Sequence, residues 1–537
     1  MTVGRIDEFA GTAEIFSLWK ISRTAWLVIG LGFVLRMYLF FRIPLINPDG
    51  FLYIQQAKAL YYGLSDSLTD CYEYLSNYPL FIVIGYKICG DWVIAARCAS
   101  LFFGTLMLIP MYLIFRRFFD ESLSTATLLA FALIPPFVLV SSDVLRDPVY
   151  WFFSASGLFL FLVHMENLTR ECEYTYIRSL MIGSLSCLCF LMGTWARIEG
   201  ALFIIISAAC LVIFRQRRRW FSLFSFLLPL LMISALGILY LYISHTDILA
   251  LLKPERLLSR PAEFFSKYTE VRHHLKILAD QEPAGFSPFF FPIVRNLIWL
   301  IALSALAVQI VETLFYVFFI ILIIGIAEAR PHIFRDSRLL YLSFLSLSAL
   351  PVLYSQVIYN WAMTSRFTML FLLPAFVFAG YGIEKISQYI RSRFQIRQGP
   401  SYIVLCILMI AAALPKTLMA TYVKDKEVYE EIGRFIAERE KNIRPVNVAG
   451  AFKEISAISF YANLNYKGAP CFDEFCMIDM PNAPDIQTVR RQSCNYLMWD
   501  EKKWGNQAES ALYGNFVRIR EWHTARHGKM VLYEAGQ

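Results

Sequence analysis

One aspartate near the start of the chain has the chemistry and the surroundings for proton transfer. Asp49 follows an apolar run over roughly residues 26–41, which is about long enough to cross a bilayer with a tilt. Basic residues precede that run, so the positive-inside rule predicts a cytoplasmic start and places Asp49 on the outer side. A carboxylate there is suited to take a proton from a hydroxyl as a general base. It is equally suited to cap a helix that starts near Phe51, and the sequence leaves both functions open.

A second acid and a polar pair have the same predicted location. Asp147 lies between Arg146 and Pro148, where it is suited either to cap the next helix or to face the first acid and orient an acceptor or a metal. Asn77 and Tyr78 open a segment that we expect to lie along the membrane interface. They are suited either to start a helix there or to contact a sugar or a phosphate.

Several basic residues lie on the predicted outer side, against the positive-inside rule. They are Arg97, Arg146, Arg197, Arg366 and the basic loop at 253–276. Charge placed against that bias needs another reason, and an anionic ligand such as phosphate supplies one. Arg197 and Glu199 are also suited to a mutual ion pair, and Arg366 allows the same two interpretations.

The composition points to a membrane protein. The chain has 537 residues, of which 57% are hydrophobic. Apolar runs of about 18 residues or more recur, so we predict a polytopic α-helical membrane protein with about eleven spans and a cytoplasmic N-terminus. The first run lacks a small-residue cleavage site, which favours a retained span over a signal peptide. The net charge of +8 is largely explained by short basic loops such as 215–219, so we expect no nucleic-acid partner.

The predicted membrane spans divide the chain into two domains. Residues 1–423 form the transmembrane domain, with large outside loops at about 43–91 and 244–292. Residues 424–537 combine charged helical segments with short β-like runs such as 496–499, which predicts a small α/β or α+β domain. Eleven spans that start inside place this C-terminal domain outside the cytoplasm, so it is periplasmic or extracellular.

The bounds of three predicted segments are set by polar residues or by length. The third covers about 124–140, and the sixth runs from Gly200 to the arginine cluster at 215–219. The segment 291–326 is too long for one simple span, so we expect an interfacial helix followed by a span.

Cysteine and histidine patterns give no metal site. The eleven cysteines contain no CxxC pair, and no His-rich spacing is present. Cys471 and Cys476 are close enough in sequence to form a small disulfide loop outside the cell, although Cys494 would then be left over. His273 and His274 are suited to ligate a metal, but adjacent histidines on a polar loop are usually solvated. We therefore expect no required cofactor, while two carboxylates would permit a divalent cation.

These motifs resemble the bacterial glycosyltransferase C superfamily, particularly its protein O-mannosyltransferases and lipid A aminoarabinose transferases. The stretch 47–57, with Asp49 and Tyr53, is similar to the family's first-loop pattern. The stretch 77–97 resembles its Pro-Pro-Leu, Gly and Ala-Ala-Arg series, and Asp147-Pro148 resembles its second acidic motif. The stretch 365–374 is similar to a late span that reads from Arg-aromatic to Pro, and a C-terminal periplasmic domain is common in the family.

The chain departs from the family pattern at two places. Gly50 follows Asp49 where the family often has Asp-Glu. A single proline, Pro79, follows Asn77 and Tyr78 where the family often has a basic residue before Pro-Pro. These differences leave the subfamily, the sugar and the acceptor open.

The resemblance implies an inverting glycosyltransferase in the bacterial inner membrane, with a polyprenyl-phosphate sugar as donor and a lipid, glycan or protein as acceptor. Asp49 would be the catalytic base and Asp147 the supporting acid. A phosphate leaving group needs no proton, so one base suffices while arginines stabilise the developing charge. The expected roles are donor-phosphate binding for Arg97, Arg197 and Arg366, and support or substrate binding for Tyr53, Asn77, Tyr78, Arg146 and Glu199.

Two other functions are compatible with the sequence. A transporter or flippase for a lipid-linked saccharide would also need arginines near a phosphate, but it would be expected to carry ionisable residues near the middle of its spans. Few charges lie inside the apolar runs, which counts against transport. A non-catalytic assembly protein that displays its C-terminal domain would leave the outer acids and arginines without a function.

Overall fold

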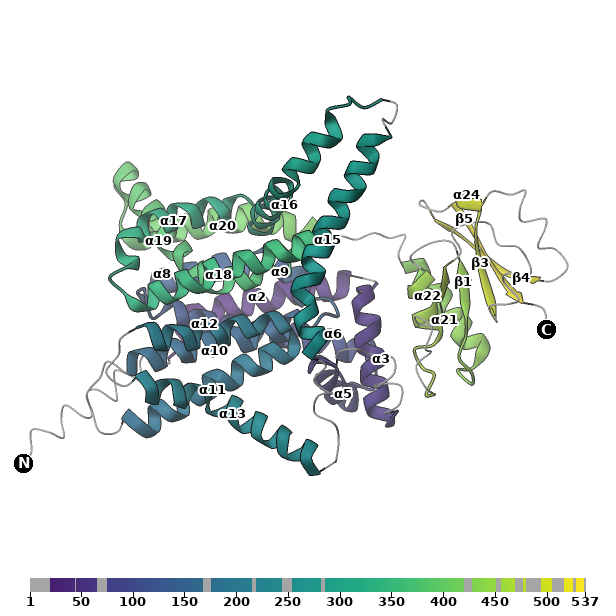
Figure 1. Cartoon of the computed structure of the whole chain (residues 1–537), viewed down its shortest axis with the longest axis horizontal. Coiled ribbons are helices and arrows are strands. Elements are labelled where there is room, and N and C mark those ends of the chain that lie inside the picture. Colours follow the sequence, from purple (N-terminus) through teal and green to yellow (C-terminus); the bar gives the residue numbers. More distant parts are fainter. Residues whose placement is uncertain are drawn as a thin grey trace, which may run out of the picture. The chain divides into compact units, whose positions relative to one another are not determined.

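The structure of the protein is a computed structural model (Figure 1). It describes residues 20–43, 45–64, 75–167, 175–214, 219–243, 254–281, 285–419, 427–450, 455–468, 477–479, 494–504, 516–524 and 528–535. The chain forms two compact units, each built from several stretches. We call them the helical unit and the mixed unit. The helical unit comprises Met1–Leu35, Phe103–Val140 and Asp147–Leu418, and the mixed unit comprises Arg36–Phe102, Ser141–Arg146 and Met419–Gln537.

The described elements of the helical unit are all helices, because long apolar segments can satisfy their backbone hydrogen bonds internally only in this way within lipid. Two helices, α2 (Arg23–Arg42) and α6 (Trp92–Leu106), continue from one unit into the other. The other bounds are α7 Leu108–Phe115, α8 Glu121–Ala132, α9 Pro135–Ser141, α10 Asp147–Asn167, α11 Thr175–Ala196, the 3₁₀ turn η1 Ile198–Gly200, α12 Ala201–Ile213, α13 Arg219–Ile243, α15 Pro254–Asp280, α16 Phe290–Leu314, α17 Val317–Ile333, α18 Ser337–Asn360, α19 Met369–Phe394 and α20 Gln398–Met419.

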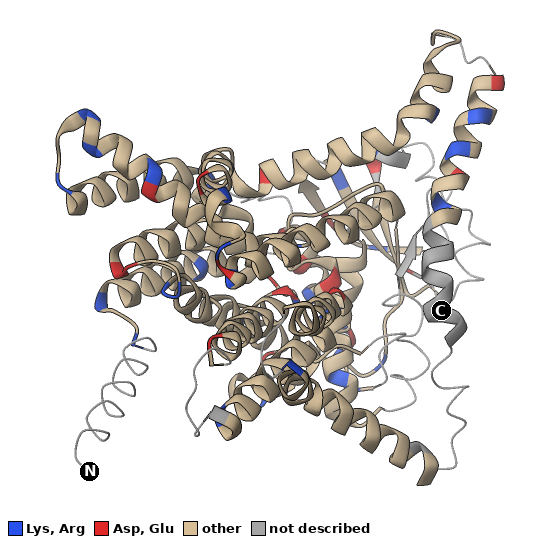
Figure 2. Ribbon diagram, turned by 60° about the vertical axis from the view of Figure 1, so that its left-hand side comes forward, with Lys and Arg blue, Asp and Glu red and all other residues tan. Residues whose placement is uncertain are grey.

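Within the described residues, nine helices are long and apolar enough to cross a membrane, or ten if the bent pair α8 and α9 forms one span. Figure 2 shows long stretches of helix that carry no Lys, Arg, Asp or Glu. The predicted fold class, a polytopic helical membrane protein, is therefore confirmed.

Three of the predicted spans differ from expectation. The third is bent by 67° between α8 and α9, where Pro135 and Pro136 provide no backbone N–H to continue the first helix. The sixth corresponds to α12, which has 13 residues and is too short to cross a bilayer by itself. In the segment 291–326 the first helix, α16, has 25 residues and meets the length of a span, whereas α17 has 17. The expected order of an interfacial helix and then a span is therefore wrong, because the first helix is itself long enough to be a span. The described residues contain nine or ten candidate spans, where about eleven were predicted for the chain.

Helices α17 and α19 pack with their backbones in contact. A Cβ atom added at Gly325 would overlap the carbonyl oxygen of Phe378, and one added at Gly382 would overlap the carbonyl oxygen of Ile321. Facing glycines are the usual means by which membrane helices approach this closely.

The mixed unit combines helices with a sheet. Its helices are α3 (Pro48–Tyr62), α5 (Tyr78–Cys89), α21 (Glu427–Glu440), α22 (Ile455–Ala462) and α24 (Glu501–Trp504). Its described strands are β1 (Val448–Gly450), β2 (Met477–Asp479), β3 (Tyr496–Asp500), β4 (Phe516–Thr524) and β5 (Gly528–Ala535). The strand order is β2-β1-β3-β5-β4.

The sheet is mixed in direction. Strand β1 pairs in parallel with β2 and β3, whereas β5 pairs antiparallel with β3 and β4. Leu497 on the central strand faces Ala449 and Tyr533 across its two neighbours, and all three side chains are buried. This sheet with its helices confirms the small C-terminal α/β fold. Three predicted features lie outside the described residues: the Cys471–Cys476 pairing, most of the arginine cluster at 215–219, and the start of the basic loop.

Candidate active site

The backbone before Asp49 is held by a helix cap. Helix α3 starts at Pro48, which suits the first helical position because proline has no N–H to leave unpaired. The side-chain oxygen of Asn47 accepts a hydrogen bond from the Asp49 backbone N–H at 3.0 Å. The cap is therefore Asn47, so the interpretation of Asp49 as an N-cap is wrong. Asp49 lies in the first turn, where a negative charge complements the helix dipole, and it is partly exposed.

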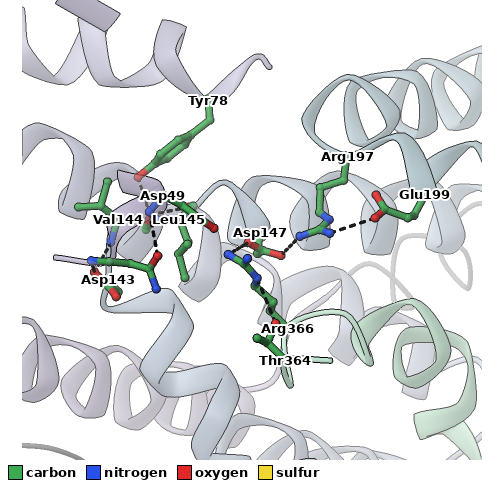
Figure 3. A network of polar contacts seen from close by, with 12 residues as sticks. Asp49, Tyr78, Asp143, Val144, Leu145, Asp147, Arg197, Glu199, Thr364 and Arg366 are labelled. Atoms are coloured by element: carbon green, nitrogen blue, oxygen red, sulfur yellow. Dashed lines mark hydrogen bonds and ion pairs between the residues drawn. The ribbon is translucent and has the colours of Figure 1, made fainter. Parts of the chain in front are cut away.

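A third acid, Asp143, supports this cap. Its Oδ1 accepts hydrogen bonds from the backbone N–H of Asn47 at 3.0 Å and of Val144 at 2.7 Å. Burial raises the pKa of Asp143 and the charge of Asp49 adds to that effect, while the two hydrogen bonds and the charge of Arg97 oppose it. The left side of Figure 3 shows this network. Asp143 was not among the predicted site residues, and its position four residues before Asp147 was the sequence signal for it.

Gly50 explains one departure from the family pattern. A Cβ atom at position 50 would lie 2.8 Å from the Cβ of Val144 and 3.0 Å from its carbonyl oxygen. A side chain there would push the segment 141–146 away from α3. Glycine therefore permits the close approach that brings the Asp143 carboxylate to the Asn47 amide.

Tyrosines on α3 and α5 form a buried contact. The Tyr78 hydroxyl lies 2.7 Å from both the Ser100 hydroxyl and the Ala96 carbonyl oxygen, to which it donates. The Tyr53 ring meets the Tyr78 ring edge-on, with the centroids 5.4 Å apart. Asn77 is fully buried at the start of α5 without a side-chain capping bond. In this structure Tyr78 joins α5 to α6, which is a structural function.

Two predicted arginines of the mixed unit contact aromatic rings. The Arg97 guanidinium donates to the Phe40 carbonyl oxygen at 3.2 Å and lies 5.8 Å from the centre of that ring. The Arg146 guanidinium lies 5.7 Å from the centre of the Tyr53 ring. Both contacts are attractive, because the face of an aromatic ring carries partial negative charge.

The helical unit holds the other predicted site residues in one ion-pair network, on the right of Figure 3. Arg197 Nη1 donates to Asp147 Oδ1 at 2.6 Å, and Arg197 Nη2 donates to Glu199 Oε1 at 3.0 Å. Arg366 Nη1 lies 3.9 Å from Asp147 Oδ2, and Arg366 Nε donates to the Thr364 hydroxyl at 3.2 Å. The mutual ion pair considered for Arg197 and Glu199 is therefore present.

The centre of this network is buried, and its two arginines balance its two acids in charge. The Asp147 side chain is 0% exposed and that of Arg197 is 6% exposed. Burial by itself lowers the pKa of Arg197, but Asp147 and Glu199 outweigh it and the pKa is raised. The Phe367 ring covers the guanidinium, with its centre 4.2 Å away. Arg197 is thus a permanently charged group of fixed orientation, held by two acids.

Local turns place these four charged residues. Asp147 is the first residue of α10, and Arg197 and Glu199 flank the start of the 3₁₀ turn between α11 and α12. A Cβ atom at Gly200 would lie 2.9 Å from the Thr194 backbone nitrogen, so glycine lets this turn fold back on α11. Arg366 lies between α18 and α19.

The structure thus assembles the predicted residues in two groups. Asp49, Tyr53, Asn77, Tyr78, Arg97 and Arg146 belong to the mixed unit, and Asp147, Arg197, Glu199 and Arg366 belong to the helical unit. The peptide bond between Arg146 and Asp147 connects the groups in the chain.

Metal ligands do not gather in the part of the chain that the structure describes: no three His, Cys, Asp or Glu side chains there are placed to hold an ion. His273 and His274 are exposed on α15, with ring centres 6.4 Å apart.

Comparisons with known proteins identify the fold. No protein-family model matches the chain, and no curated protein matches its sequence. The apo oligosaccharyltransferase of Archaeoglobus fulgidus matches in structure with a TM-score of 0.55 and 11% identity, covering 96% of this chain and 74% of the archaeal chain. Apo ArnT from Cupriavidus metallidurans matches with a TM-score of 0.54 and 13% identity, covering 94% of this chain and 97% of ArnT.

A third structure adds a lipid ligand. ArnT from the same organism, bound to undecaprenyl phosphate, matches with a TM-score of 0.53 and 12% identity, covering 95% of this chain and 98% of ArnT. Matches that span almost the whole chain at such low identity establish the fold alone. The chain therefore has a polytopic membrane fold like that of the archaeal oligosaccharyltransferase and of ArnT, which is the kind of fold that the sequence motifs predicted.

Proposed function

We propose that the protein transfers a sugar from a polyprenyl-phosphate donor to an acceptor, with inversion at the anomeric carbon. It shares its fold with an oligosaccharyltransferase and with ArnT, and ArnT has been solved with undecaprenyl phosphate bound. Because fold alone does not fix function, the proposal depends on the chemistry of the site residues.

The observation that carries the proposal is the way the chain holds Asp49. The Asn47 N–H donates to Asp143 and the Asp49 N–H donates to Asn47, and these bonds fix the backbone there while Asp49 itself remains partly exposed. A general base must be fixed in orientation and still be reachable by the acceptor. The fixed backbone of Asp49 and its partly exposed side chain support this assignment.

The proposed reaction is a single displacement. The acceptor hydroxyl loses its proton to Asp49, and its oxygen forms a bond to the anomeric carbon as the bond from that carbon to the phosphate oxygen breaks. The electron pair of the broken bond remains on the departing prenyl phosphate. Arg97, Arg197 and Arg366 are the proposed partners of that phosphate, because guanidinium groups match phosphate oxygens in geometry and charge.

The acids of the helical unit have a supporting role in this proposal. Asp147 and Glu199 hold Arg197 in one orientation, so its charge needs no rearrangement when the donor binds. Arg366 approaches Asp147 at the longer distance of 3.9 Å, which suits a group that exchanges part of this contact for the phosphate. Tyr53 and Arg146 are proposed to contact the substrates, whereas the fully buried Asn77 and Tyr78 are proposed to support the site from within the fold.

The proposed location is the bacterial inner membrane, with the N-terminus in the cytoplasm and residues 424–537 in the periplasm. The basis is the positive-inside rule applied to the apolar runs. In this orientation Asp49 lies on the same side as the C-terminal domain.

Purified protein in lipid nanodiscs tests the function. It is given a radiolabelled polyprenyl-phosphate sugar and a panel of lipid, glycan and peptide acceptors, and labelled product is measured. We expect transfer by the wild-type protein and none by Asp49→Asn. The control is Asp91→Asn: Asp91 caps a helix by accepting from the Ile94 N–H at 2.8 Å, and asparagine caps equally well. Full activity in Asp49→Asn would refute the assignment of the base. Movement of the donor across a liposome membrane without any transfer would support the transporter instead.

A further inference from the structure

One face of helix α3 buries a charged residue for which the proposed reaction has no use. Phe51, Ile54, Gln55 and Lys58 are spaced at i, i+3, i+4 and i+7, so they lie on the same face of the helix. All four are almost fully buried, at 4% exposure or less. Burying a lysine costs free energy unless its ammonium group is hydrogen-bonded, so another part of the chain must supply an acceptor.

The acceptor comes from the C-terminal part of the chain. Lys58 Nζ donates to the Asn463 carbonyl oxygen at 3.0 Å in a buried site. Two turns earlier on α3, the Phe51 ring stacks on the Phe460 ring of α22, with the centroids 4.5 Å apart and the planes 24° apart. Both ends of this face of α3 are thus fixed to α22 and the residue that follows it.

The partner surface is itself rigid. The Asn463 side chain accepts from the Val446 N–H at 2.8 Å and donates to the Val446 and Ser459 carbonyl oxygens, both at 2.9 Å. These bonds tie the end of α22 to the segment that leads into β1. A Cβ atom at Gly433 would lie 2.6 Å from the Tyr461 Cβ, so α21 packs directly on α22.

Tyr461 lies within electrostatic range of the charged groups around the Asn47 cap. It is buried next to Phe460, and it interacts electrostatically with Arg97 and Asp143. Asp143 is the residue that holds Asn47, and Asn47 holds Asp49. The C-terminal part of the chain therefore contacts α3 through the Lys58 hydrogen bond and the Phe51 stacking.

We propose that α22 holds the proposed base in place, with Lys58 as a positioning residue that acts through α3. This inference rests on the proposed function of Asp49. Lys58 lies nine positions after Asp49, which is about 14 Å along a helix at 1.5 Å per residue. A small change in the tilt of α3 at Lys58 therefore displaces the carboxylate at its other end. A displacement of about 1 Å is enough to cost on the order of 10²-fold in rate.

The test uses full-length protein in nanodiscs and two independent changes to the contact. Lys58→Met removes the ammonium and keeps most of the volume of the side chain. Phe460→Ala removes the stacked ring, whereas Phe460→Leu keeps most of the apolar contact. Lys87→Met is the matched control, because Lys87 is exposed in the last turn of α5. Hydrogen–deuterium exchange of residues 48–62 reports on the docking of α3 and requires no catalytic activity.

We expect exchange of residues 48–62 to become at least tenfold faster in Lys58→Met and Phe460→Ala, and to be unchanged in Lys87→Met. The kcat for transfer should fall on the order of 10²-fold in the same two variants, with the KM for the donor within twofold of wild type. Phe460→Leu should retain most of the activity. If either variant does not fold, the remaining variant and Phe460→Leu decide the question.

Three results separate the possible failures. Unchanged exchange in the variants that lose the contact would overturn the proposed docking. Faster exchange with unchanged kcat would overturn the positioning role of Lys58. If wild-type protein transferred no sugar, the proposed function would fail, while the exchange data would still decide whether α22 fixes α3.

Discussion

Removal of Arg197 should destabilise the helical unit strongly. Arg197→Met keeps a side chain of similar length but deletes the charge that pairs with Asp147 at 2.6 Å and with Glu199 at 3.0 Å. The Asp147 carboxylate is 0% exposed, so water cannot replace the lost partner. Its nearest described cation is then Arg366 at 3.9 Å, which is beyond hydrogen-bond distance.

The magnitude follows from the burial of the pair. Removing one partner of a buried ion pair costs about 3–5 kcal/mol, because the other charge remains buried without compensation. Asp147→Asn should cost less, about 1–3 kcal/mol, since Arg197 retains Glu199. The double variant removes both charges, so it should cost about 1–3 kcal/mol less than the sum of the single variants.

An exposed pair of the same length is the control. Arg439 and Glu534 are also 2.6 Å apart, but their side chains are 44% and 31% exposed. Arg439→Met should therefore cost about 0–1 kcal/mol. Unfolding by urea in mixed micelles, followed by tryptophan fluorescence, gives the free energy of unfolding for each variant. The reasoning would be refuted if Arg197→Met lost no more stability than Arg439→Met, or if the double variant were simply additive.

Three further changes have defined outcomes. Burial lowers the pKa of Lys58 from 10.5 to about 8. Between these pH values the folded chain has released a proton that the unfolded chain still holds, so the free energy of unfolding rises with pH. Wild type should therefore gain up to about 3 kcal/mol of stability over Lys58→Met as pH rises from 8 to 10.5. Burial raises the pKa of Asp143 above 3.8, so the folded chain holds a proton there that the unfolded chain has already released. Wild type therefore loses stability as pH rises through the folded pKa, and Asp143→Asn should gain stability relative to it over that rise. Gly325→Ala should destabilise the α17–α19 contact by several kcal/mol because its Cβ meets backbone, whereas Gly237→Ala, with nothing within 4 Å, should be neutral or slightly stabilising.

A different result would contradict each of these three predictions. Parallel pH curves for wild type and Lys58→Met would show that this lysine is not buried in solution. Parallel curves for Asp143→Asn would show the same for that carboxylate. Equal stabilities of the two glycine variants would contradict the close approach of α17 and α19.

Local patterns in the sequence predicted most of the helices and the ion pair between Arg197 and Glu199. Apolar length defined most of the spans, since a membrane helix must hide its backbone over the full thickness of the bilayer. The β-like run at 496–499 became the buried strand β3. The pairing of Arg197 with Glu199 was accessible because the two residues are only two positions apart.

Contacts between distant segments could not be predicted in this way. Nothing in the local pattern around Lys58 indicates that its acceptor is Asn463, which lies 405 residues away. Asp143 was missed for a related reason, since its importance comes from a bond to Asn47 in another part of the chain. The bend between α8 and α9, by contrast, was readable from Pro135 and Pro136, which the prediction of a straight third span did not take into account.

The most direct test of the account is the rate of sugar transfer by Asp49→Asn under saturating donor, measured together with the affinity for the donor. A positioned general base contributes about 10²–10⁴-fold to a rate. The account predicts a fall of that size in kcat, with donor binding retained because the phosphate is held by arginines. An Asp49→Asn protein that transfers sugar within a few-fold of the wild-type rate would contradict it.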